Sequence, residues 1–126
     1  MRDFCFFTKN KIIIDDCLEA LKSEVKNIET NNDGEIWVNG KWMSCFHVFN
    51  EGWEDFHFID EEHESEFKGA IPFEDPFVND FETHRSIDLK RFITALLKVY
   101  PELYVYSDED DFIGSGREFL EREFDY

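Results

Sequence analysis

Apolar positions recur along the chain at spacings that predict both strands and helices. The Phe-rich segment Asp3–Thr8 predicts an opening strand. The next apolar residues recur at intervals of three and four, which places them on one side of a helix of about four turns. That stripe consists of Ile14, Cys17, Leu18, Leu21, Val25 and Ile28.

A hairpin is predicted next, because Asn39-Gly40 lies between two apolar segments, Glu35–Val38 and Lys41–Phe49. Asn-Gly tolerates the positive φ angles of a type I′ turn. After a break at 50–52, Trp53–Asp60 predicts a third antiparallel strand that completes a meander.

The periodicity fails from Glu61 to Thr83, where Pro72 and Pro76 predict an irregular loop of about twenty residues. Loops of this length in compact domains are usually functional or disordered. The apolar residues of this loop predict that it packs against the rest of the chain. They are Phe67, Ile71, Phe73, Phe77, Val78 and Phe81.

The last third of the chain predicts a second long helix, a strand and a short helix. Ser86 is a candidate N-cap for the long helix, and Pro101 ends it. Leu103–Tyr106 predicts a short strand, and a capping box that begins at Ser115 opens a short helix to about Phe124.

Together these elements predict a single α+β domain over residues 1–126. We expect an antiparallel sheet of about five strands, with two main helices on one face and a short C-terminal helix. The central order, strand-helix-strand-strand-helix-strand, resembles a ferredoxin-like topology with one added strand.

Charge is distributed unevenly along this pattern. The chain has a net charge of −17, and residues 51–82, called the acidic stretch below, contribute −11 through twelve carboxylates and one basic residue, Lys68. Like charges held together oppose compaction. With 42% apolar residues, including fifteen Phe, the chain is nevertheless too hydrophobic to be a disordered acidic tail.

The composition also excludes several classes of partner. Nucleic acid and anionic membranes require a basic surface, and the thirteen Lys and Arg are scattered. No apolar run is long enough to span a bilayer, and no signal peptide is apparent. Three widely spaced cysteines, Cys5, Cys17 and Cys45, each lie in an apolar segment, which predicts buried free thiols and a cytoplasmic location.

No motif predicts a metal, a cofactor or a catalytic site. The run Asp60–Glu64 offers many oxygen ligands near His57, but its spacing fits no recognised metal motif. Asp108–Asp111 lacks the Gly and Glu of a calcium loop, and predicts a solvated turn instead. Cys45 and His47 lie two apart on a strand and share a face, which alone does not predict a nucleophile and its base.

The simplest interpretation of the acidic stretch is a solvated surface that favours solubility. Its concentration, its lack of basic residues and its aromatic neighbours favour instead an interface for a basic protein. The predicted partner-binding residues are Glu51, Trp53, Glu54, Asp55, Asp60, Glu61, Glu62, Glu64 and Glu66.

In overall character the chain resembles bacterial immunity proteins of toxin–immunity systems, including those of contact-dependent growth inhibition. The resemblance rests on a small acidic chain, few cysteines, and carboxylates clustered with aromatic residues. It implies a non-catalytic inhibitor that binds one cognate toxin domain, often a nuclease with a basic cleft. It also implies that Asp60, Glu61, Glu62, Glu64 and Glu66 pair with Lys and Arg of that cleft.

Three alternatives remain open. A scaffold or adaptor domain would bind its partner weakly and reversibly. A nucleic-acid mimic would copy the phosphate spacing of a duplex and bind several unrelated DNA-binding proteins. A hydrolase that uses carboxylates or a metal would show turnover.

Overall fold

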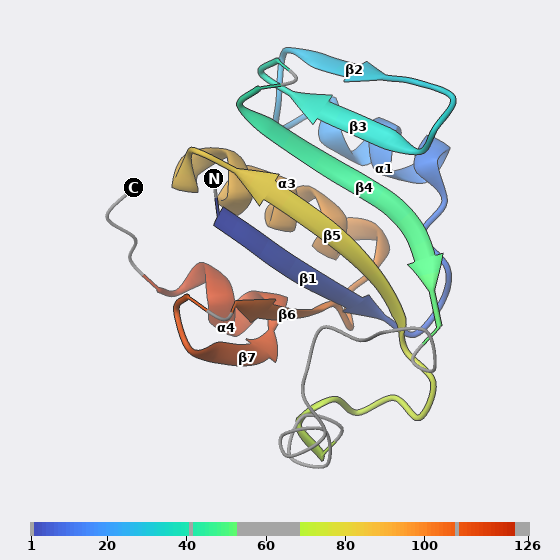
Figure 1. The fold of residues 1–126 in the computed structure, drawn as a ribbon, viewed down its shortest axis with the longest axis vertical. Coiled ribbons are helices and arrows are strands. Elements are labelled where there is room, and N and C mark those ends of the chain that lie inside the picture. Colours follow the sequence, from blue (N-terminus) through green and yellow to red (C-terminus); the bar gives the residue numbers. More distant parts are fainter. Residues whose placement is uncertain (1, 41, 53–68, 108, 123–126) are drawn as a thin grey trace.

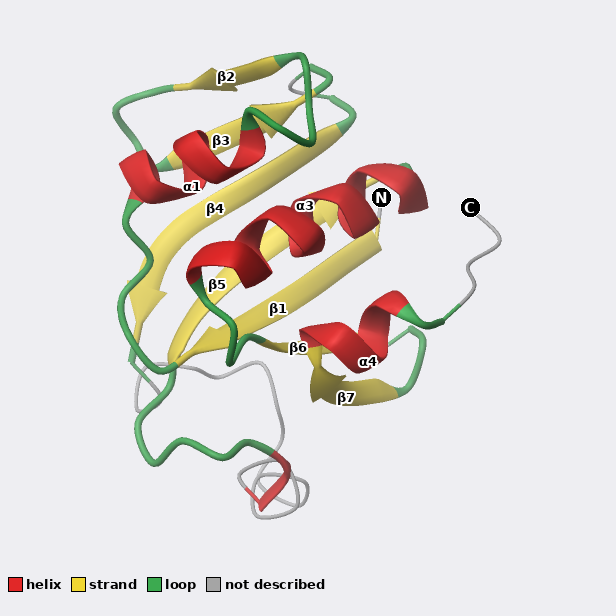
Figure 2. Cartoon of the chain, turned by 180° about the vertical axis from the view of Figure 1, so that it is seen from behind, coloured by secondary structure: helices red, strands yellow, loops and turns green. Residues whose placement is uncertain are grey.

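The computed structural model describes residues 2–40, 42–52, 69–107 and 109–122. In chain order its elements are β1 Arg2–Thr8, α1 Ile14–Leu21, β2 Ile28–Thr30, β3 Glu35–Val38, β4 Ser44–Glu51, β5 Phe77–Thr83, α3 Ser86–Val99, β6 Tyr104–Ser107, β7 Phe112–Ser115 and α4 Gly116–Leu120. The strands form one antiparallel sheet in the order β2-β3-β4-β5-β1-β6-β7 (Figure 1). Figure 2 shows α1, α3 and α4 on one face of this sheet.

The core between sheet and helices is built from phenylalanine. Phe6, Phe46 and Phe81 come from the adjacent strands β1, β4 and β5, and all are fully buried. Phe92 of α3 packs on them, with its ring centroid 4.8 Å from those of both Phe46 and Phe81. Burial of each ring contributes roughly 1.5–3 kcal/mol. The helices and the antiparallel sheet that this core joins confirm the predicted α+β class.

Strand β5 corrects the prediction of an irregular loop from Glu61 to Thr83. Phe77–Thr83 pairs with β1 along its whole length and also with β4, so it is a central strand. Apolar alternation fails there because Asn79 occupies an inward position. Its side chain accepts a hydrogen bond from the backbone N–H of Asn50 (2.8 Å) and donates one to the Asn50 side chain (3.1 Å).

The described residues already form a sheet of seven strands, so the expectation of about five is wrong. The strands that the sequence did not predict are β5 and the short edge strands β2 and β7. The structure does not show the ferredoxin-like strand order. Both edge strands have three or four residues, too few for a period of two to stand out in the sequence. The predicted strand Trp53–Asp60 lies outside the described residues.

Helix α1 is shorter than its apolar stripe predicts. It ends at Leu21, after which Val25 is buried in a turn and Ile28 begins β2. Val25 and Ile28 are β-branched, which lowers the helix propensity of this part of the stripe. Spacings of three and four residues therefore continue beyond the helix itself.

The Asn39-Gly40 turn has the predicted positive φ angles, 58° and 103°, but it is not a two-residue hairpin loop. Val38 pairs with Ser44, so residues 39–43 connect the two strands. The loop is longer because Asn39 is tied elsewhere: its backbone N–H donates to Asn27 O (2.9 Å) and its side chain to Asp88 (2.8 Å).

Helix α3 begins at Ser86 without the predicted cap, since Arg85 is the N-cap and no side chain caps it. Asp88, in the first turn, is instead completely buried. Its carboxylate accepts hydrogen bonds from Asn39 Nδ2 (2.8 Å) and Ser44 Oγ (2.9 Å). Asp88 thus joins the helix to the β3–β4 loop and to the start of β4.

Ser115 is confirmed as the N-cap of the last helix, and the reciprocal bond of a full capping box, from the Ser115 backbone N–H to Glu118, is not among the hydrogen bonds of the described residues. Ser115 Oγ accepts a hydrogen bond from Glu118 N (3.2 Å) and donates one to the Glu118 carboxylate (3.1 Å). Helix α4 extends from Gly116 to Leu120, shorter than the predicted end near Phe124. Strand β6, at Tyr104–Ser107, lies one residue beyond its predicted position.

Two further expectations concern the cysteines and the membrane. Cys5, Cys17 and Cys45 are all free and buried, as predicted. Within the described ranges, no helix has both the length and the apolar character needed to cross a membrane.

We expect Asp88→Ala to lower the free energy of unfolding by about 2–4 kcal/mol, because Asn39 and Ser44 lose a charged, buried acceptor. Urea unfolding followed by circular dichroism measures this change. Asp15→Ala is the matched control, since Asp15 is an exposed first-turn carboxylate of α1. A similar loss in both variants would contradict the role given to Asp88.

Candidate functional site

The face of the sheet opposite the helices carries most of the titratable side chains of the central strands. Because side chains alternate along a strand, the residues between the core phenylalanines point to this face. At one end it is apolar, where Ile71 packs with Cys5, Phe7 and Val78. The remaining part, called the acidic face below, consists of Asp3, Glu35, Cys45, His47, Asp80 and Glu82.

Strand register arranges the acidic face as two cross-strand rows over β3, β4, β5 and β1. In one row Glu35 is opposite His47, which is opposite Asp80. In the next row Cys45 is opposite Glu82, which is opposite Asp3. Facing residues in an antiparallel pair have Cβ atoms about 4.5–5.5 Å apart, so each row is a chain of interacting side chains.

The carboxylates at the β5 end of these rows repel one another. Burial, with the charges of Asp3 and Glu82, raises the pKa of Asp80 to about 6. Burial and the charge of Glu82 likewise raise the pKa of Asp3. One oxygen from each of these three residues lies within 4.8 Å of the others. The acidic face therefore concentrates negative charge at a cost to folding.

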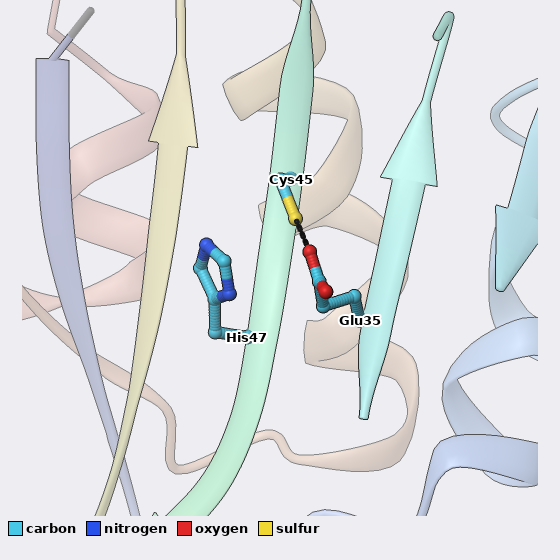
Figure 3. Close-up of side chains that lie close together, drawn as sticks. All are labelled: Glu35, Cys45 and His47. Atoms are coloured by element: carbon cyan, nitrogen blue, oxygen red, sulfur yellow. Dashed lines mark hydrogen bonds between the residues drawn. The ribbon is translucent and has the colours of Figure 1, made fainter. Parts of the chain in front are cut away.

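Glu35 and Cys45 form a hydrogen-bonded pair at the β3 end (Figure 3). The Cys45 thiol donates to Glu35 Oε2 at 3.5 Å, and Glu35 also accepts from Asn31 Nδ2 (3.1 Å) and Trp37 Nε1 (3.3 Å). The bonds from Asn31 and Trp37 lower the pKa of Glu35. Burial and the Glu35 contact raise the pKa of Cys45 to about 12, so its thiol is protonated and is not an activated nucleophile.

His47 of β4 lies between Glu35 on β3 and the carboxylates of Asp80 and Glu82 on β5. Its Nε2 atom is 3.6 Å from Glu82 Oε2, an ion-pair distance when the imidazole is protonated. This nitrogen is shielded from solvent and has no hydrogen-bond partner. The ring stacks on Phe49, with centroids 5.6 Å apart and planes inclined by 6°. His47 is thus fixed in orientation, and Cys45 and His47 share a face as predicted.

The predicted partner-binding residues fall mainly outside the described part of the chain. Only Glu51 is described, and it is exposed at the end of β4. The other predicted residues (Trp53, Glu54, Asp55, Asp60, Glu61, Glu62, Glu64 and Glu66) lie outside the described residues, as do the whole candidate metal run Asp60–Glu64 and His57. Whether they form one surface therefore stays a prediction.

Sequence reasoning missed most of the acidic face. Asp3 and Glu35 lie outside the acidic stretch, and Asp80 and Glu82 were assigned to a loop. The signal that could have found them is the alternation of Asp80 and Glu82 with the inward Asn79, Phe81 and Thr83. Recognising Asn79 as an inward polar residue would have identified the strand.

The acidic turn after β6 is only partly solvated. Within its described residues, Asp110 accepts hydrogen bonds from Ser107 Oγ (2.7 Å) and from Arg2 (3.1 Å). Its side chain is 15% exposed. Asp111 has a positive φ of 48°, as the tight β6–β7 turn requires. The described part of this turn therefore binds Arg2 through Glu109 and Asp110.

A pocket of about 540 Å³ lies away from the acidic face. Its lining mixes aromatic residues with both signs of charge, and includes no histidine or cysteine. The lining residues are Lys9, Pro72, Phe73, Glu74, Asp75, Pro101, Glu102, Tyr104 and Ser115. The acidic face remains the stronger candidate because it brings a carboxylate, a thiol and an imidazole, from Glu35, Cys45 and His47, within 4.8 Å of one another.

We expect Asp80→Asn to stabilise the protein at pH 7 by about 1–3 kcal/mol. The pKa of Asp80 is raised on folding, so its contribution to stability is full below about pH 4 and is lost as the pH rises through about 6. Urea unfolding with a chelator present, at pH 4 and pH 7, measures the difference between variant and wild type.

Asp75→Asn is the control for this experiment, because it removes one charge at an exposed position of the same acidic stretch. Its effect should stay within about 0.5 kcal/mol at both pH values. An Asp80→Asn variant whose stability follows the wild-type pH profile would contradict the assigned repulsion.

Comparison with protein-family models, with curated proteins and with solved structures found no match to this chain. Any function assigned to it rests on its own residues and their geometry.

Proposed function

We propose that the protein is a non-catalytic inhibitor that captures a cognate basic toxin domain through its acidic face and acidic stretch, as immunity proteins do. One observation carries the proposal: Asp3, Asp80 and Glu82 are held together on the sheet although they repel one another. A basic partner surface would relieve that repulsion.

Within the described residues, the salt bridges that the structure shows for Lys and Arg are with carboxylates outside the acidic face, and the ion pair on the face itself is the one that His47 makes with Glu82 when it is protonated. Arg2 binds Glu109 and Asp110, at 3.4 and 3.1 Å, at the opposite edge of β1. Lys98 binds Glu24 (2.9 Å), on the helical side. The carboxylates of the acidic face therefore remain available to Lys and Arg of a partner.

Aromatic side chains border these carboxylates. Phe49 is 57% exposed and stacks on His47, and Trp37 is half-buried beside Glu35. Aromatic residues are enriched at protein interfaces, where they contribute affinity while charges guide the encounter. The acidic face has both components that an interface for a basic protein uses.

The acidic stretch adds further carboxylates to the chain between the strands that carry the acidic face. It begins at the end of β4 and ends in β5, the two strands at the centre of the cross-strand rows. Its −11 charge attracts a basic domain from a distance, and electrostatic guidance of this kind brings association rates to about 10⁸–10⁹ M⁻¹s⁻¹ at low salt. Rapid capture is what an inhibitor of a toxic enzyme requires.

The direct test uses the protein encoded by the neighbouring reading frame. We expect its C-terminal domain to arrest growth when produced alone, and co-production of this chain to restore growth. The purified pair should bind with a Kd of about 1 nM or less, and the association rate should fall steeply with salt.

Two results would contradict the proposal. In the first, the C-terminal domain of the neighbouring protein does not bind this chain, and co-production of this chain does not restore growth. Equal binding to several unrelated DNA-binding proteins would indicate a nucleic-acid mimic instead.

Charge reversal should locate the interface. We expect Asp3→Lys/Glu82→Lys to slow association at least about tenfold at low salt, because the guiding field then opposes the partner. Stopped-flow kinetics measure this rate. Glu102→Lys/Glu121→Lys is the matched control, since it changes the net charge equally at exposed positions elsewhere. Equal slowing in both variants would mean that net charge, and not the acidic face, guides association.

A further inference from the structure

We infer that Glu35, Cys45 and His47 form a site for a zinc-type divalent transition metal. This site involves chemistry different from that of the proposed inhibitor function, and needs no partner protein. On binding, the metal takes one carboxylate oxygen, the Cys45 sulfur as thiolate and one imidazole nitrogen. The thiol proton passes to solvent, and a water completes the coordination.

The distances suit a tetrahedral metal after small side-chain rotations. One ligand atom from each of the three residues lies within 4.8 Å of the others. Zinc bonds of about 2.0–2.3 Å in a tetrahedron place neighbouring ligand atoms about 3.5 Å apart. Cys45 Sγ and Glu35 Oε2 are already 3.5 Å apart, so one edge of the tetrahedron has the required length.

Strand register makes this cluster rigid. Glu35 is directly opposite His47 in the β3–β4 pair, and Cys45 precedes His47 by two residues on the same face of β4. Ligands on neighbouring strands hold their separation better than ligands on loops do. Figure 3 shows all three side chains on the same face of the sheet: Glu35 lies between β3 and β4, Cys45 lies over β4, and the His47 ring lies beside β4 on the side away from β3.

Neighbouring residues already orient two of the ligands. Asn31 and Trp37 hold the Glu35 carboxylate by hydrogen bonds from their side chains. Glu82 Oε2 lies 3.6 Å from His47 Nε2, so a small movement on metal binding would let Nε2–H donate to Glu82, as the non-ligating nitrogen of a metal-bound histidine commonly does to a carboxylate. The other nitrogen, Nδ1, is then left as the metal ligand. Glu82 acts here as a positioning residue.

The combination of sulfur, nitrogen and oxygen ligands selects the type of metal. Calcium and magnesium prefer oxygen alone, whereas thiolate and imidazole favour zinc and its neighbours. Three protein ligands with one open position is an arrangement that zinc adopts in proteins. Asp3, Asp80 and Glu82 next to the site add negative charge that attracts any cation.

Cobalt(II) titration of the full chain, stripped with a chelator, tests the site without reference to activity. We expect one equivalent of Co²⁺ to give a thiolate charge-transfer band in the near ultraviolet and intense visible bands of tetrahedral cobalt, both removed by Zn²⁺. Cys45→Ser should abolish the charge-transfer band. His47→Gln should weaken binding beyond the roughly 10–100-fold range of residues that only orient a ligand.

Three variants make the test specific, with circular dichroism showing that each is folded. His84→Gln changes an exposed histidine and Cys5→Ser a buried thiol of the same sheet face, so both should leave the spectrum unchanged. Glu82→Gln should weaken binding about 10–100-fold and keep the charge-transfer band.

Four outcomes would overturn the inference. They are no spectral change on adding Co²⁺, a charge-transfer band that survives Cys45→Ser, a band lost in Cys5→Ser, and binding of Ca²⁺ with no preference for Co²⁺ or Zn²⁺. The last two would indicate another thiol or a site made only of carboxylates.

Discussion

Packing of phenylalanine rings between the central strands and α3 is the interaction on which the rest of this structure depends. Phe46 of β4 is directly opposite Phe81 of β5, and Phe6 of β1 lies on the same face, with its ring centroid 5.8 Å from that of Phe81. Phe92 of α3 packs on all three rings. A shift of one residue in any of these strands would turn its phenylalanines to the opposite face. The rings therefore fix the register of the sheet, and with it every position on the acidic face.

The acidic face follows from that register, and it is not favourable for folding in itself. Asp3 lies directly opposite Glu82, an arrangement of like charges that destabilises a strand pair. The fold accepts this because the hydrophobic burial on the other face is larger than the repulsion. Residues retained at a cost to stability are candidates for function, which is why these carboxylates carry more weight than the other acids of the chain.

Local patterns predicted the elements that have a local cause, and failed where the cause is distant. The N-cap at Ser115 and the helix that ends before Pro101 depend on neighbouring residues, and both were predicted. Strand β5 was missed because Asn79 is satisfied by Asn50, a partner far away in the sequence. The acidic stretch was evident from composition, but the cross-strand rows join four strands, and no local pattern contains their register.

Metal binding and capture of a basic partner would use the same face without excluding each other. A divalent ion adds two positive charges and displaces the one proton of Cys45, so the net charge of −17 would change only to −16. The long-range field that guides a basic partner depends on the sum of charges and would barely change. Local contacts differ, because Glu35 would be occupied while Asp3 and Asp80 stay available. Metal should therefore alter the lifetime of a complex more than its rate of formation.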